Sequence, residues 1–369
     1  MRLYNNRSSG FDYLRLGLSL AVFIWHCFVL SSLTKLRNTP FLEEVHMILP
    51  MFFALSGFLV SGSMLRTKTI REFITLRAVR IMPALAAEVL LSAFLIGTIM
   101  TILPLKSYFQ DDLFRVYFWN LVGHVQFLLP GVFTSNPLPL VNISLWTIPY
   151  ELYCYLAIVI LWMVGAVPHR KWLLLALVIT AQLALPIRDA ETDNLIRTWA
   201  SNVPGRFLVL SFLYGVVIYA FAEVIVMRWW MAVVAAAMCA IMMHWAIAIY
   251  FMAFPAAYLT VFLGLTNPPR IPVLMDGDYS YGIYLYAGPI QQMVIDLFPA
   301  HRNGLFVMAV AILPICLFAA FSWHVIEKPV LGRRKSVIAA VMRTTDQLVS
   351  AFRRLTGRRH APAAPPTQD

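Results

Sequence analysis

The stretch DYLRLGLSLAVFIWHCFVLSSL, residues 12–33, decides the class of fold. After Asp12 and Arg15 near its start, it carries no further carboxylate, lysine or arginine. A helix of this length can cross a bilayer whose hydrocarbon core is about 30 Å thick. Because a backbone in lipid must satisfy its own hydrogen bonds, we expect a transmembrane helix here. Further apolar runs follow, so we interpret this helix as retained and not as a cleaved signal peptide.

The composition extends this interpretation to the whole chain. Hydrophobic residues make up 60% of the 369 residues and charged residues 13%, and the mean hydropathy is +0.73. Soluble domains carry about 25% charged residues. The apolar runs are unbroken and do not alternate with polar residues, which favours helices over a β-barrel. The sequence therefore predicts an all-α fold, a polytopic bundle of transmembrane helices.

About ten segments are long and apolar enough to be candidate spans. They are residues 12–33, 46–65, 81–104, 143–166, 172–187, 205–226, 229–243, 245–265, 279–298 and 304–326. We expect them to form one transmembrane domain over residues 1–330. We found no internal repeat and no soluble domain.

Segment 113–133 is apolar but ambiguous, and the distribution of charge decides how we interpret it. The densest internal basic cluster, Arg66 to Arg80, follows the second span. If 113–133 does not cross, this cluster, the later basic loops and both termini all lie in the cytoplasm, as the positive-inside rule requires. If it does cross, every later loop inverts. We therefore predict that it is re-entrant or lies along the outer surface.

The net charge of +11 arises between spans and in the tail, which argues against a nucleic-acid partner. The four cysteines lie inside apolar runs without metal-ligand spacing, so no metal site is expected. Residues 331–369 form a second element, in which apolar residues at helical spacing share the stretch with arginines. This pattern is typical of an amphipathic helix on an anionic membrane surface, here followed by a disordered end.

Ionisable residues inside spans are candidates for function. Arg15 and His26 are eleven positions apart, which places them on nearly one helix face about 16 Å apart along the axis. Arg15 would lie at the cytoplasmic mouth and His26 deeper. Arg15 could instead extend to the inner interface, and His26 could simply hold helices together.

Glu151 is expected about 12 Å below the outer edge, close to the depth of His26. A buried carboxylate needs a partner, and His26 is the natural one. Such a pair suits general base chemistry, although a purely structural pair is the alternative.

Arg77 and Arg80 share one helix face at the inner surface. Paired guanidinium groups bind phosphates in bidentate fashion, and the alternative is a cluster that only sets topology. For six weaker candidates we favour structural roles, with a basic partner conceivable for Glu88. They are Glu88, Gln291, Gln292, His46, His324 and Glu327.

Several motifs then occur in a fixed order. They are Arg15 followed by ten residues and His26, FFALSGFL at 52–59, RAVRIMP at 77–83, SLWTIPYE at 144–151 with Tyr155, DYSYGIYLY at 278–286 and IEKP at 326–329. Together they cover about residues 10 to 330, and as an ordered set they resemble the acyltransferase 3 family of integral membrane acyltransferases.

The resemblance implies a bacterial inner-membrane enzyme that uses a cytoplasmic acyl-CoA, with acetyl as the first choice, as co-substrate and no bound cofactor. The acceptor would be a hydroxyl of an exopolysaccharide or a lipid-linked glycan facing outward. His26 would be the general base or an acyl carrier, Glu151 would orient it, and Arg15, Arg77 and Arg80 would hold the donor. Residues expected near the acceptor are Ser144, Trp146, Tyr150, Tyr155 and Gln291.

Two departures from the family pattern stand out. Ala287 occupies a place where many members have a histidine. Some members also carry a C-terminal hydrolase-like domain, so acceptor specificity is expected within the membrane part here. The rival hypothesis is a transporter or exporter of a glycolipid or small anion, since buried His, Glu and Arg also suit substrate pathways.

Overall fold

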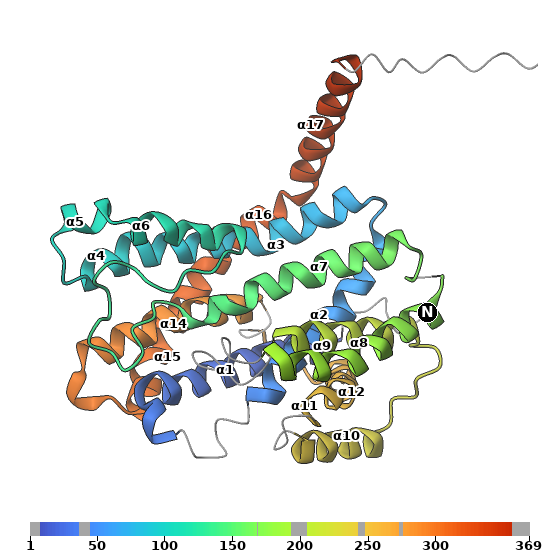
Figure 1. Cartoon of the computed structure of the whole chain (residues 1–369), viewed down its shortest axis with the longest axis horizontal. Helices are drawn as coiled ribbons and strands as arrows, with labels where there is room; N and C mark the ends of the chain where they lie inside the picture. The colour runs from blue at the N-terminus through green and yellow to red at the C-terminus, as the bar shows by residue number, and fades with distance from the viewer. Residues whose placement is uncertain are drawn as a thin grey trace, which may run out of the picture.

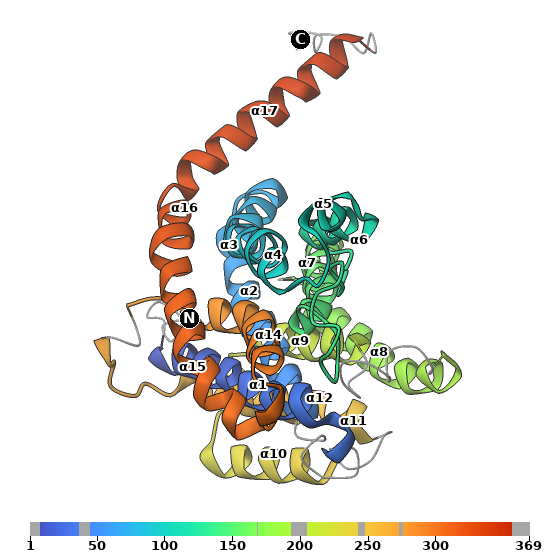
Figure 2. The ribbon, with the colours of Figure 1, turned by 90° about the vertical axis from the view of Figure 1, so that its left-hand side faces the viewer.

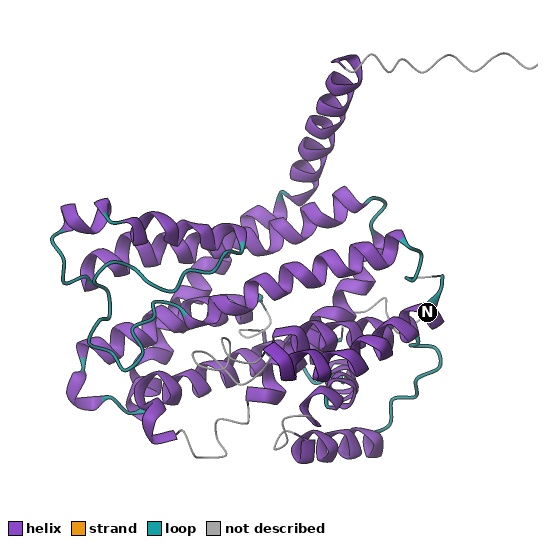
Figure 3. Cartoon of the chain, in the orientation of Figure 1, coloured by secondary structure: helices purple, strands orange, loops and turns teal. Residues whose placement is uncertain are grey.

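The protein is described here from a computed structural model, over residues 8–36, 45–167, 169–192, 205–242, 248–272 and 276–355. Within these ranges it consists of helices and loops, and its one β-type pairing is an isolated bridge between Thr101 and Val132 (Figure 3). The all-α prediction is confirmed.

The helices follow the predicted apolar segments in chain order (Figure 1). They are α1 (Ser9–Leu36), α2 (Val45–Arg66), α3 (Ile70–Leu90) with η3 (Leu91–Ile96) and α4 (Gly97–Met100), α5 (Leu105–Gln110), α6 (Asp112–Tyr117), η4 (Phe118–Val122), η5 (Ile143–Thr147), α7 (Ile148–Met163), α8 (Lys171–Thr192), α9 (Gly205–Ala220), α10 (Trp229–Met242), α11 (Ala248–Phe251), α12 (Ala253–Leu265), α14 (Tyr279–Leu297), η6 (Pro299–His301), α15 (Gly304–Phe321), η7 (Ser322–Glu327), α16 (Lys328–Gly332) and α17 (Arg334–Leu355).

Five helical stretches are long and apolar enough to cross a membrane by length and composition. They are Ser9–Ser31, Met47–Arg66, Ile70–Met100, Ile143–Met163 and Gly304–Gly332. Four further apolar helices are shorter: Lys171–Leu185, Gly205–Ala220, Trp229–Met242 and Ala253–Leu265. These helices indicate a membrane protein, whereas the predicted total of about ten spans and the side on which the termini lie remain predictions.

The segment that follows α4 forms a loop whose first and last residues are hydrogen-bonded to each other. The Ile102 amide donates to the Gly131 carbonyl at 3.0 Å, and the Thr101 hydroxyl donates to the Pro130 carbonyl at 2.7 Å. Between these points α5, α6 and η4 fold back beside α3 and α4 (Figure 1). A segment closed in this way fits the prediction that residues 113–133 do not cross.

The closest helix contact, between α2 and α9, depends on glycine. A Cβ atom at Gly57 would lie 2.0 Å from the Phe212 carbonyl oxygen, and one at Gly215 would lie 2.1 Å from that of Ala54. Small residues let helix backbones approach in this way where lipid gives no hydrophobic drive. α1 packs mainly against α14, α15 and α12.

Two helices contain a wide π-type turn. η3 continues α3 into α4, and η7 continues α15 into α16. η7 ends at Glu327, whose side chain is 1% exposed. After α16 the chain bends, and α17 extends away from the bundle (Figure 2).

Candidate functional site

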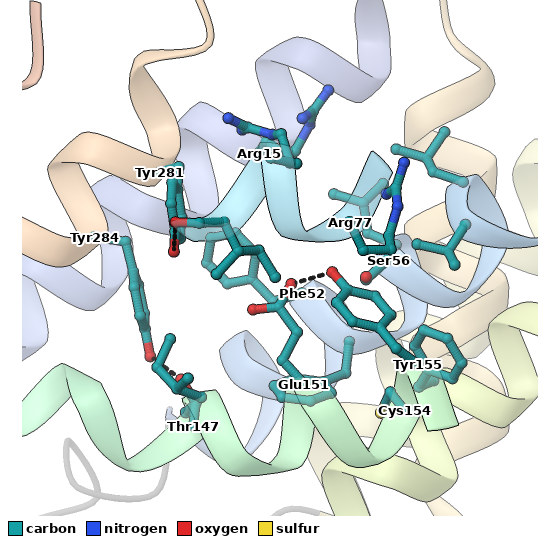
Figure 4. A pocket seen from close by; sticks show the side chains of 18 of the residues that line it. Arg15, Phe52, Ser56, Arg77, Thr147, Glu151, Cys154, Tyr155, Tyr281 and Tyr284 are labelled. Carbon is teal, nitrogen blue, oxygen red and sulfur yellow. Dashed lines mark hydrogen bonds between the residues drawn. The ribbon is translucent and has the colours of Figure 1, made fainter. Parts of the chain in front are cut away.

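A pocket of about 190 Å³ lies between α1, α2, α3, α7 and α14 (Figure 4). The polar and aromatic side chains that line it come from all five helices, from η5 and from α9. They are Arg15, Phe52, Phe53, Ser56, Arg77, Arg80, Thr147, Glu151, Tyr155, Phe212, Ser280, Tyr281 and Tyr284. The three predicted donor-binding arginines and Glu151 therefore meet at one cavity.

Two of these arginines are bound to carboxylates. The Oδ2 atom of Asp278 accepts hydrogen bonds from Arg15 Nη1 and Arg80 Nη2, both at 2.6 Å. Arg15 also donates to Asp12 at 3.0 Å, and Arg80 donates to Glu327 at 2.9 Å. We call Arg15, Asp278, Arg80 and Glu327 the arginine–carboxylate network. It connects α1, α3, η7 and the start of α14, so these charges hold helices together.

Arg77 has different surroundings. Its Nη2 atom donates to the Ser63 hydroxyl at 3.2 Å, and its guanidinium carbon lies 5.8 Å from the centre of the Phe73 ring. Its Nε atom is buried and has no hydrogen-bond partner in the described part of the chain. Within those residues no carboxylate forms an ion pair with Arg77. It can therefore give bonds to a ligand without breaking an ion pair.

Glu151 points into the pocket from α7, one turn before Tyr155 (Figure 4). The Tyr155 hydroxyl donates to the Glu151 carboxylate. One turn before Glu151, the Thr147 hydroxyl shares a hydrogen bond of 2.7 Å with the Tyr284 hydroxyl of α14 (Figure 4). The pocket thus combines a carboxylate, hydroxyls and a guanidinium, the groups that could bind and orient a polar, anionic substrate.

The predicted pairing of His26 with Glu151 is wrong. His26 is 4% exposed, it does not line the pocket, and its Nδ1 atom has no hydrogen-bond partner among the described residues. The reason is the order in which the helices pack. α1 packs mainly on α14, α15, α12 and α2, whereas α7 packs mainly on α9, so similar depth does not bring the two side chains together.

Gln291 lies beside the helix turn that carries His26. Its Nε2 atom donates to the Phe23 carbonyl at 2.8 Å and to Cys27 Sγ at 2.9 Å. Its Oε1 atom is buried and lacks a partner in the part of the chain that the structure covers. His26 and Gln291 thus form a second polar region, deeper along α1 than Arg15.

Of the other residues expected near the acceptor, Tyr155 lines the pocket, and three do not. Ser144 and Trp146 are buried in η5. Tyr150 stacks edge-on against Trp146 at 5.9 Å and packs against Gly205 at the start of α9. These three side chains therefore pack within the protein and do not line the pocket.

The weaker candidates take structural positions. Glu88 is fully buried and accepts from Asn142 and Ser92, both at 2.8 Å, so the basic partner considered for it is replaced by neutral donors. Gln292 donates to the Leu138 and Leu140 carbonyls at 2.7 Å.

Two further candidates are histidines. His324 meets the Tyr279 hydroxyl at 3.1 Å. The side chain of His46 lies outside the described residues.

The sequence interpretation missed the role of Asp278 and underrated Glu327. Both belong to quoted motifs, Asp278 to the one at 278–286 and Glu327 to the one at 326–329, and this membership is the signal that could have drawn attention to them. It also missed Ser63, which lies outside every motif, and it gave no separate role to Tyr281 and Tyr284 within the motif at 278–286.

Comparison with known proteins agrees with the sequence motifs. The acyltransferase domain family matches residues 8–324. An O-acetyl transferase of Shigella phage Sf6 is 25% identical over 344 residues, which covers 89% of this chain and 97% of that protein. Nodulation protein 10 of Rhizobium leguminosarum bv. viciae is 25% identical over 375 residues, covering 91% and 97% respectively. No solved structure matches the chain. Because the family match spans nearly the whole chain, the protein belongs to the acyltransferase 3 family and is an acyltransferase that transfers groups other than aminoacyl groups.

Proposed function

We propose that the protein is a membrane-embedded O-acyltransferase that moves an acetyl group from a cytoplasmic acyl-CoA to a hydroxyl of an exopolysaccharide or lipid-linked glycan. The observation that carries this proposal is the pocket that combines Arg77, whose Nε atom has no partner in the described chain, with Glu151 and Tyr155. The similarity to an O-acetyl transferase supports acetyl as the group transferred. A bacterial inner membrane as the location is part of the same proposal.

The size and charge of the pocket suit one part of the donor. A cavity of roughly 150 Å³ can hold a benzene-sized molecule, so about 190 Å³ is enough for a phosphate group of the acyl-CoA, whose thioester end would extend to His26. Arg77 would bind a donor phosphate through charge-assisted bonds, because among the described residues its guanidinium makes one hydrogen bond, to a neutral hydroxyl. Arg15 and Arg80 would mainly position the helices around the donor, since carboxylates already bind them.

The acceptor would react near His26. His26 Nδ1 and Gln291 Oε1 are buried polar atoms without partners in the described chain, and Gln291 is bonded to α1 on both sides of His26. Buried polar atoms of this kind gain from binding a hydroxyl. The imidazole would accept the proton of the acceptor hydroxyl.

The reaction then balances without a further cofactor. The deprotonated oxygen attacks the thioester carbonyl carbon, the carbon–sulfur bond breaks, and the proton held by the imidazole goes to the leaving CoA thiolate. An ester of the acceptor and free CoA result. Direct transfer from CoA to the acceptor is the simplest mechanism. The alternative is a mechanism in which the His26 imidazole first carries the acyl group.

The test is acyl transfer by purified protein in lipid nanodiscs, with radiolabelled acetyl-CoA and a panel of glycan acceptors. His26→Ala is expected to reduce transfer by roughly 10²- to 10⁴-fold, the usual contribution of a general base. Ser19→Ala is the matched control, because Ser19 is a buried polar residue of α1 that bonds to its own helix at the Leu16 carbonyl. Full activity of His26→Ala would refute the proposed base, and label on no acceptor with the wild type would refute the proposed reaction.

A further inference from the structure

An open cleft of about 480 Å³ lies where α16 meets α17, separate from the pocket described above. An aromatic ring, three basic side chains and one leucine line it. Its lining residues are Trp323, Lys328, Leu331, Gly332, Arg334 and Lys335. Lys328, Arg334 and Lys335 are exposed, and the lining contains no acidic residue. Such a cleft attracts an anionic group next to an apolar one.

The helix that begins at this cleft is amphipathic. Val337, Ile338, Val341 and Met342 recur at helical spacing and are partly buried, and this part of α17 packs against α3. The same apolar face continues beyond the contact. Leu348 is 65% exposed and Val349 is 47% exposed. The far half of α17 thus presents apolar side chains that the described part of the protein does not cover.

α17 carries many more basic than acidic residues. Its basic residues are Arg334, Lys335, Arg343, Arg353 and Arg354, and its one acidic residue is Asp346. The Asp346 carboxylate accepts from Arg71 of α3 at 2.6 Å, so that it neutralises a cation of the bundle. An apolar face together with an excess of cations is the pattern of a helix that lies on an anionic lipid surface.

The direction of α17 fits such a surface. In Figure 1, α1, α3 and α7 run close to horizontal, whereas α17 stands steeply to them. Three of the membrane-length stretches are Ser9–Ser31, Ile70–Met100 and Ile143–Met163, which lie in those horizontal helices. A membrane crossed by them would have α17 running along its plane. The contact with Arg71 fixes α17 at the end of the bundle where α2 ends and α3 begins.

We infer that the cleft and α17 bind the headgroups of anionic phospholipids, with one headgroup in the cleft and the apolar face of α17 in the adjoining lipid. The cations of the cleft would contact the phosphate and Leu331 the upper part of an acyl chain. The partner is lipid and not the acyl donor, because the cleft shares no lining residue with the pocket. Glu327, which accepts the hydrogen bond from Arg80, directly precedes Lys328 in the chain.

The test uses the full chain in nanodiscs made from an equal mixture of phosphatidylcholine and phosphatidylglycerol. After exchange into detergent, mass spectrometry gives the ratio of the two lipids that stay bound. The wild type is expected to retain phosphatidylglycerol in roughly 25-fold preference, and Arg334→Gln/Lys335→Gln should lose most of it, since each of the two surface cations contributes about a factor of five. Lys106→Gln/Arg115→Gln is the matched control, because it removes two exposed charges at α5 and α6, away from the cleft.

A second measurement follows α17 itself. An environment-sensitive fluorophore on Leu348→Cys, in a Cys316→Ala background that removes the exposed native thiol, should shift to the blue in phosphatidylglycerol nanodiscs more than in phosphatidylcholine alone. Equal lipid ratios for the wild type and the cleft variant would overturn the inference. A raised KM for acetyl-CoA in the cleft variant, with an unchanged lipid ratio, would also overturn it and assign the cleft to the donor.

Discussion

Arg77 and Arg80 lie three residues apart on α3 and both line the pocket, yet their guanidinium groups have different surroundings. Arg80 bonds to Asp278 and Glu327, and Arg15 shares the same Asp278 oxygen. Arg77 bonds to a serine hydroxyl and leaves its Nε atom without a partner within the described residues. The basic motif at residues 77–83 thus contains two arginines with different roles. Arg80 connects helices through the arginine–carboxylate network, and Arg77 remains available to a ligand.

The largest effect is expected from removing Arg80. Arg80→Ala leaves the Glu327 carboxylate, which is 1% exposed, without its cation. Breaking a buried ion pair in this way should lower the free energy of unfolding by about 3 kcal/mol. Thermal unfolding of the protein in detergent measures the loss. Arg80→Ala/Glu327→Gln should recover part of it, and a single variant as stable as the wild type would show that the network does not hold the helices.

Removing Arg77 should change binding and leave stability nearly unaltered. A charge-assisted bond contributes about 2 kcal/mol, so Arg77→Ala should raise the KM for acyl-CoA by roughly 30-fold. The measurement is acyl transfer over a range of donor concentrations, with thermal unfolding of the same preparation. Arg71→Ala serves as control, because Arg71 is on the same helix but bonds to α17. An unchanged donor KM in Arg77→Ala would remove the distinction between the two arginines.

Tyr155→Phe should have a smaller effect, on turnover. The change deletes the hydroxyl that donates to the Glu151 carboxylate and keeps the ring. A hydrogen bond of about 1 kcal/mol predicts a roughly fivefold lower kcat with the donor KM unchanged. If donor KM rose and kcat stayed constant, Glu151 and Tyr155 would belong with Arg77 in donor binding.

The smallest effect is expected at Ser63. Its hydroxyl accepts one bond from Arg77, at 3.2 Å, so Ser63→Ala should raise the donor KM by roughly twofold. Steady-state measurement of the donor KM for Ser63→Ala, with Ser19→Ala as the control, would resolve this change. A rise as large as that of Arg77→Ala would mean that Ser63 itself contacts the donor.

The sequence predicted well those features that depend on local pattern. Apolar runs predicted the helices, and the all-α fold is confirmed. The interpretation that residues 113–133 are re-entrant or lie along the outer surface stays a prediction. Motifs also indicated residues that meet at one pocket, from Arg15 to Tyr155. The functions of these residues remain proposals.

Contacts between distant helices could not be predicted in the same way. Position along a helix gave similar depths for His26 and Glu151, but depth says nothing about which helices are neighbours. The bonds of Asp278 to Arg15 and Arg80 join residues far apart in the chain, and a single sequence contains no signal for such pairs. Asp278 therefore looked like part of a motif and not like the centre of a network.

The wide turn η7 has a consequence for the whole C-terminal region. A π-type turn holds one residue more than the α-helix around it, as though a residue had been inserted there. If Ser322–Glu327 closed into an ordinary α-helix with no residue removed, everything after it would rotate by about 100°. Glu327 would then turn away from Arg80, and Asp346 of α17 would turn away from Arg71. One extra residue in this turn thus sets the direction in which the last two helices face.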